Sequence, residues 1–226
     1  MNRTLCLAAM AACIALPARA DRPLVSETAD VIPTGSCQVE TAAARLSRSG
    51  SPSANTLNAL FSCGVAGIHQ VAAGYGRSRS GGETVQSLIL GGKSTLLAPD
   101  AGSTGFGVAY AVTLVKTPQQ SFEHEGTSIL AVATRELVDG LLGHANLGWS
   151  RSQSARLNSS TWSLGFEYGS ERTVAADIFG DDRSRPWVSA GFGWTVVDKL
   201  SVNLAYAQQF ETPRVKQVSV GFKIVF

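Results

Sequence analysis

The chain has 226 residues, of which 44% are hydrophobic and 16% are charged, so it is long enough for one domain with a sizeable core. Charge is sparse against the ~25% that is usual for soluble domains. The net charge of +2 comes from Arg3 and Arg19 within residues 1–20, so the rest of the chain has no net charge to support a nucleic-acid partner.

Residues 1–20 have the three parts of a secretory signal peptide. Arg3 precedes a short apolar run over 5–16, and Ala18-Arg19-Ala20 follows as a small-residue cleavage site. The run is shorter than the ~20 apolar residues that a transmembrane helix needs. We expect cleavage after Ala20, which leaves a mature chain with equal numbers of basic and acidic residues.

The next segment, residues 21–34, is polar and contains two prolines. We expect it to be a periplasmic N-terminal segment, and one hypothesis is that it enters the barrel predicted below as a plug. After residue 34, apolar and polar residues alternate in runs of about ten, broken by Gly, Pro, Asp and Ser, which is typical of strands. The predicted strands cover 35–46, 56–64, 68–78, 83–97, 103–117, 126–137, 141–152, 159–169, 171–181, 186–196, 199–210 and 215–226.

Alternation of this kind fits either a soluble β-sandwich or a membrane barrel. The polar faces are rich in Gly, Ala, Ser and Asn rather than Lys and Glu, which suits a confined lumen. Aromatic residues lie near predicted strand ends, as in the girdles of membrane barrels. The chain ends in Phe226 on an alternating strand, a terminal signature typical of bacterial outer-membrane barrels that their assembly machinery reads.

These features predict an all-β fold: a transmembrane, antiparallel, up-and-down β-barrel over residues 35–226, with about twelve strands. Ten strands is the alternative if residues 56–78 are wrongly divided. An even number agrees with bacterial single-chain barrels, and the predicted turns alternate between short periplasmic and longer outer connections. The expected location is the bacterial outer membrane, with membrane lipid and the barrel-assembly machinery as partners.

Cleavage of the signal peptide removes Cys6 and Cys13 and leaves Cys37 and Cys63. These two residues face each other across a predicted hairpin centred on Gly50. Opposed residues of an antiparallel pair are ~4.5–5.5 Å apart, within the range that a disulfide spans. In an oxidising compartment this geometry predicts a Cys37–Cys63 disulfide, and two unrelated small buried thiols are the alternative.

Residues 91–97, "GGKSTLL", match the end of a phosphate-binding loop. The pattern needs a Gly where this chain has Ser87, and a helix where it has a strand end and Pro99, so we expect no nucleotide site. We instead expect the Lys93 side chain to face the lumen. Alternation along the predicted strands places six other polar side chains on the same inner face. The seven predicted lumen-facing residues are Glu40, Lys93, His144, Asn146, Glu167, Asp177 and Lys223.

Two further motifs contain residue types that carry chemistry. Glu123-His124-Glu125 lacks the spacing of a zinc site and is interpreted as part of a polar outer loop. His144 and Asn146 share a strand face, and outer-membrane lipid hydrolases place such residues beside a Ser nucleophile on a barrel wall. No nucleophile can be assigned from the sequence, so we expect no catalytic residues, no metal and no cofactor.

Four stretches resemble the outer-membrane family named for the meta-pathway of phenol degradation. They are "RPLVSETADVIPTGSCQVE" (22–40), "HANLGW" (144–149), "RPWVSAGFGWTVVDKLSVNLAY" (185–206) and "VSVGFKIVF" (218–226). The resemblance implies a transporter barrel and an association with aromatic compounds. The chain departs from the family at Lys116-Thr117-Pro118, which lacks the Gly that usually follows such a Pro, and in its cysteine pair.

The leading functional hypothesis is passive or facilitated passage of a small solute, hydrophobic or aromatic by the family resemblance. A membrane-embedded lipid hydrolase centred on His144 and Asn146 is the second hypothesis. A structural or adhesive barrel that acts through its outer loops is the third.

Overall fold

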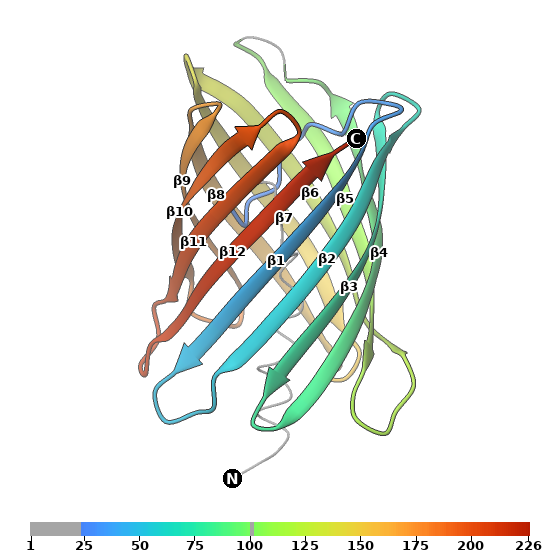
Figure 1. Ribbon diagram of the computed structural model, residues 1–226, viewed down its shortest axis with the longest axis vertical. Coiled ribbons are helices and arrows are strands. Elements are labelled where there is room, and N and C mark those ends of the chain that lie inside the picture. Colours follow the sequence, from blue (N-terminus) through green and yellow to red (C-terminus); the bar gives the residue numbers. More distant parts are fainter. Residues whose placement is uncertain (1–23, 100–101) are drawn as a thin grey trace.

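The computed structural model describes residues 24–99 and 102–226, so the predicted signal peptide lies outside the described residues. The described chain forms twelve β-strands (Figure 1). They are β1 (Cys37–Arg48), β2 (Ala54–Val65), β3 (His69–Ser80), β4 (Glu83–Leu97), β5 (Thr104–Lys116), β6 (Glu123–Val138), β7 (Leu141–Ser152), β8 (Leu157–Tyr168), β9 (Arg172–Asp181), β10 (Trp187–Val197), β11 (Leu200–Gln209) and β12 (Val215–Val225).

The strands form one closed barrel, in which each strand pairs with its neighbours in sequence and β1 pairs antiparallel with β12. The ten-strand alternative is therefore wrong, and the predicted twelve-stranded, antiparallel, up-and-down barrel is confirmed. Closure leaves no sheet edge, so backbone N–H and C=O groups along the wall are paired within the sheet, as a hydrocarbon environment requires. No helix among residues 24–99 and 102–226 is long and apolar enough to cross a membrane.

The wall is apolar outside and polar inside. On β8, Leu164, Phe166 and Tyr168 are exposed on the outer face, whereas Gly165 and Glu167 between them are buried on the inner face. A soluble sandwich would show the opposite pattern. The period-two alternation of the sequence therefore separates a lipid-facing surface from a polar interior.

The strands extend further than predicted at the rim that carries the longer loops. β2 begins at Ala54 rather than 56, β6 at Glu123 rather than 126, and β8 at Leu157 rather than 159. Glu123 and His124 continue the pairing of β6 with β5 past a register shift, so the predicted outer loop 118–125 ends earlier. The sequence did not predict these strand ends because their residues are mostly polar. Hydrogen bonding with the neighbouring strand continues there, although the apolar alternation has stopped.

Both ends of the barrel chain lie at one rim. Cys37 N–H donates to the Phe226 carbonyl at 2.8 Å, Phe226 N–H donates to the Cys37 carbonyl at 2.9 Å, and Figure 1 shows the C-terminus where β1 begins. This rim carries short turns such as 139–140 and 198–199, whereas the opposite rim carries loops such as 117–122 and 182–186. Because bacterial barrels have short periplasmic turns, we infer that the first rim is periplasmic.

Cys37 and Cys63 form the predicted disulfide. They are register partners in the β1–β2 pair, and their Cα atoms are 4.1 Å apart. The cross-link therefore joins the first hairpin at the periplasmic rim, directly after the N-terminal segment.

We expect the double variant Cys37→Ser/Cys63→Ser to fold but to be less stable. Loop-closure entropy for two residues 26 positions apart predicts a loss of about 3.5 kcal/mol in the free energy of unfolding. Urea denaturation of the refolded barrel in lipid vesicles measures this loss. Reduced wild-type protein is the matched control and should follow the same curve. Superimposable curves for the variant and the oxidised wild type would contradict the expectation.

Candidate functional site

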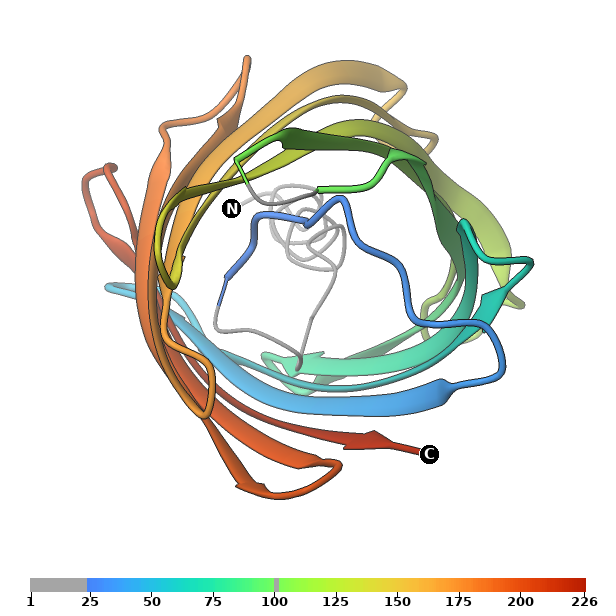
Figure 2. The ribbon, with the colours of Figure 1, turned by 90° about the horizontal axis from the view of Figure 1, so that it is seen from above.

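Residues 24–34 lie inside the barrel. In Figure 2 the blue trace of this N-terminal segment crosses the interior of the ring before it joins β1. Leu24, Ser26, Glu27, Thr28 and Ala29 are all buried, and Ala29 has no exposed surface. We call residues 24–34 the lumen segment; it covers the described part of the predicted segment 21–34.

The first part of the lumen segment is held by β7 and β9. The Asp177 carboxylate on β9 accepts the N–H groups of Val25 at 2.6 Å and Ser26 at 3.1 Å. The Asn146 side chain on β7 accepts the Glu27 N–H at 2.7 Å and donates to the Glu27 carbonyl at 3.0 Å. These contacts satisfy backbone groups that would otherwise be buried without partners.

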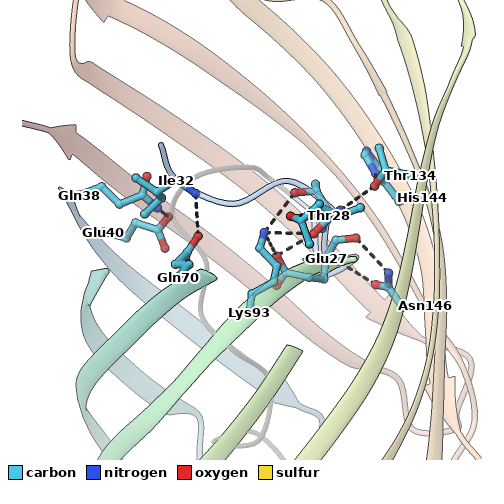
Figure 3. Close-up of polar contacts among 12 residues, drawn as sticks. Glu27, Thr28, Ile32, Gln38, Glu40, Gln70, Lys93, Thr134, His144 and Asn146 are labelled. Carbon is cyan, nitrogen blue, oxygen red and sulfur yellow. Dashed lines mark hydrogen bonds and ion pairs between the residues drawn. The ribbon is translucent and has the colours of Figure 1, made fainter. Parts of the chain in front are cut away.

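A buried ion pair holds the middle of the lumen segment to β4 (Figure 3). Lys93 Nζ lies 2.9 Å from Glu27 Oε1 and also donates to the Thr28 carbonyl at 3.1 Å. Both side chains are almost fully buried. Removal of one member would leave an uncompensated charge, at a cost of about 3–5 kcal/mol.

The next residues meet β4, β5 and β6. Ala29 donates its N–H to Thr134 Oγ1 at 2.9 Å, and its carbonyl accepts from Thr95 Oγ1 at 2.6 Å. The Ala29 methyl group packs in a small apolar cluster with Ala109 and Val132 of the inner wall. A short side chain is therefore required at position 29, because Ala29 has no exposed surface and packs against the inner wall.

The last part of the lumen segment reaches β2 and β3. Ile32 N–H donates to Gln70 Oε1 on β3 at 3.2 Å, and Thr34 forms a bridge with Gly64 on β2. A Cβ atom at Gly64 would lie 2.0 Å from the Ile32 carbonyl oxygen, so only glycine allows this approach. At the other end, a Cβ atom at Gly165 would lie 2.7 Å from Ser26 Oγ.

The seven predicted lumen-facing residues lie in three groups. Lys93, Asn146 and Asp177 contact the lumen segment directly. His144 is buried beside them, with Nδ1 3.1 Å from Thr134 Oγ1 and Nε2 3.8 Å from Glu167 Oε2.

The third group, Glu40 and Lys223, lies apart from the first two. These residues are register partners across the β1–β12 closure, and Glu40 Oε1 accepts from Gln38 Nε2 at 2.6 Å. Sequence reasoning missed Glu27, Gln70, Thr95 and Thr134. The last three share the inward parity of Lys93 or His144, whereas Glu27 lies in an irregular segment without parity.

The residues of the hydrolase hypothesis are occupied by structural contacts. The hydroxyl that contacts His144 Nδ1 belongs to Thr134, which also accepts the Ala29 N–H. Both polar atoms of the Asn146 amide bind the Glu27 backbone, and Ser163 donates to the same amide oxygen at 2.8 Å. His144 and Asn146 face the lumen rather than the lipid, so a lipid substrate would not reach them from the membrane.

The other two sequence motifs have structural roles. Lys93 of "GGKSTLL" is within β4 and not at a helix N-terminus, so the geometry of a phosphate-binding loop is absent there. His124 Nε2 contacts the Gly126 carbonyl and Thr127 Oγ1 in its own strand. No three His, Cys, Asp or Glu side chains gather as a metal site within the part of the chain that the structure describes.

A closed wall with an apolar exterior and a polar interior defines an outer-membrane β-barrel. The chain belongs to the family described as uncharacterised conserved protein UCP029691, whose model matches residues 8–226. No curated protein matches the sequence. The resemblance to the phenol-degradation family is supported only at the level of a barrel, because none of the comparisons confirms membership of that family.

Several solved outer-membrane barrels have a similar structure. The KdgM porin in complex with disordered oligogalacturonate has a TM-score of 0.62 at 7% identity, with 84% of this chain and 99% of that chain covered. The CymD monoaromatic hydrocarbon channel has a TM-score of 0.52 at 10% identity, with 88% and 90% covered. Outer membrane phospholipase A from Escherichia coli has a TM-score of 0.51 at 8% identity, with 83% and 92% covered.

At these identities the likeness shows the fold alone. The same fold contains channels and an enzyme, so the site must decide between these functions.

We expect Asn146→Leu to detach the first part of the lumen segment while the barrel stays folded. The substitution keeps the side-chain volume but leaves the Glu27 N–H and carbonyl without partners, which weakens docking by about 2–4 kcal/mol. Hydrogen–deuterium exchange of the peptide that contains residues 24–34 should accelerate strongly. Asn58→Leu, at another inward position on β2, is the control. Equal protection in the two variants would contradict the assignment of Asn146 as an anchor.

Proposed function

We propose that the protein is an outer-membrane channel for a small polar solute, with a pore that the lumen segment narrows. One observation carries the proposal: the segment spans the lumen from wall to wall. Its early residues bind Asp177 on β9, and Ile32 binds Gln70 on β3. These strands are six positions apart in a closed ring of twelve, so they are on opposite sides of the barrel.

The chemistry of the inner wall supports a polar solute. The buried inward side chains include Ser, Thr, Asn, Gln, Glu, Asp and Lys, which bind water and polar groups. An inner aromatic pair, Phe179 and Trp187, stacks with ring centroids 6.1 Å apart and would suit an apolar ring. One aromatic pair on a mostly polar wall favours a solute that forms hydrogen bonds over the hydrophobic one predicted from the resemblance.

The two other hypotheses have less support. The hydrolase hypothesis needs His144 and Asn146 to be accessible to lipid, yet their polar atoms hold the lumen segment or its anchor Thr134. The adhesion hypothesis needs large outer loops. The connections at the outer rim, such as 49–53 and 210–214, are only a few residues long.

Single-channel recording in a planar lipid bilayer tests the proposal. We expect the refolded wild-type protein to show small discrete conductance steps. Deletion of residues 24–33 should increase the conductance several-fold, because it removes the chain that crosses the pore while leaving Cys37 and the barrel intact. Asn58→Leu should conduct like the wild type.

The possible outcomes separate the two parts of the proposal. Equal conductance of the wild type and the deletion variant would show that the lumen segment does not limit the pore. Absence of steps in both proteins, with a folded barrel shown by heat-dependent gel mobility, would contradict a channel. If either protein conducts, vesicle swelling with small sugars measures its preference for polar solutes.

A further inference from the structure

Basic side chains gather on the outside of the barrel wall, near the outer rim. Arg45 on β1 and Arg77 and Arg79 on β3 are all exposed on the outward face. Cross-strand register places Arg45 and Arg79 in one row, joined through Asn55, with Arg77 one row below. We call Arg45, Arg77 and Arg79 the outer basic patch.

The outer basic patch lacks acidic neighbours in its own part of the wall. The strands around it are β11, β12, β1, β2, β3 and β4, and the acidic residues in them are Glu40 and Glu83. Glu83, at the start of β4, has the inward parity of Val85 and Ser87, whereas the register partner of Arg79 is Thr84. Glu40 is buried on the inner face and cannot reach the outside. Arg48, the last residue of β1, does have an acidic partner, because its Nη2 lies 3.1 Å from Glu211 Oε1. The three guanidinium groups therefore form a region of concentrated positive charge.

The patch lies near the ends of its strands, where the lipid headgroup layer is expected. Arg79 is one residue from the end of β3, and Arg45 is three residues from the end of β1. An arginine at the middle of the bilayer would be costly, whereas the cost falls close to zero at the interface. At this depth the guanidinium groups meet the charged groups of the surrounding lipid.

An apolar groove lies below Arg45 and Arg79, in the cross-strand row that contains Arg77. Its floor is Ala43, which lies between Leu57 on β2 and Val220 on β12 in one cross-strand row. Leu204 continues this row on β11, and Arg77 ends it on β3. The short side chain of Ala43 between longer neighbours leaves a shallow apolar trough, and the arginines border its upper end.

We infer that this surface is a specific binding site for a phosphorylated, acylated glycolipid of the outer leaflet, of the lipid A type. The guanidinium groups would bind the phosphate oxygens, with which arginine forms paired, charge-assisted hydrogen bonds. The groove would hold one acyl chain. A zwitterionic phospholipid has no net charge to balance three arginines, whereas a bis-phosphorylated headgroup does. The inference does not depend on transport through the lumen.

Native mass spectrometry of the refolded full-length mature protein in neutral detergent tests the site with bis-phosphorylated lipid A as the probe. An arginine at an anionic lipid surface is worth about a fivefold change in affinity, so Arg45→Gln/Arg77→Gln/Arg79→Gln should bind about a hundredfold more weakly. Arg151→Gln is the matched control. Arg151 is exposed near the outer end of β7, on the opposite side of the barrel, and should leave binding unchanged.

Two further measurements separate the lipid from its parts. Ala43→Leu should weaken lipid A binding by filling the groove, while all three arginines stay in place. Millimolar inorganic phosphate should not displace lipid A. Equal binding by the wild type and the triple variant, an equal loss in Arg151→Gln, or full displacement by phosphate would each overturn the inference. Heat-dependent gel mobility confirms that each variant is a folded barrel.

Discussion

Pairing of β1 with β12 is the constraint on which the rest of the structure depends. It closes the sheet, so backbone groups along the wall find partners without water. Closure then forces every strand to present one face to lipid and one to a narrow interior. Polar side chains such as Asp177 and Asn146 can be buried only on the inner face, where they need partners. The lumen segment supplies those partners from its own backbone.

The lumen segment and the wall depend on each other energetically. A chain without regular structure has N–H and carbonyl groups that are costly to bury, and the wall has charged groups that are costly to leave unpaired. The Glu27–Lys93 pair offsets both costs in one place. Lys93 binds the Glu27 carboxylate, which pairs the charges, and the Thr28 carbonyl, which satisfies a backbone group. The disulfide at Cys37 anchors the hairpin from which the segment enters, so its path begins at a fixed point.

The sequence predicted the wall well because strand side chains alternate with a fixed period. Parity alone put Lys93, His144 and Asp177 on the inner face and Cys37 opposite Cys63. It could not predict the path of residues 24–34, which have no period and bind side chains from strands that are distant in sequence. The partner of Lys93 is one example. A buried lysine needs an acid, but nothing in the local pattern distinguishes Glu27 from Glu40 or Glu167 as that acid.

The central claim is that the docked lumen segment narrows the pore. Charge reversal at Glu27 and Lys93 tests this claim most directly. The measurement is single-channel conductance of Glu27→Lys, Lys93→Glu and the double variant. Each single reversal places like charges together in a buried site, so the segment should detach and the conductance should rise. The double variant restores the pair and should return to the small conductance of the wild type. A double variant at least as open as the single ones, or single variants that match the wild type, would contradict the account.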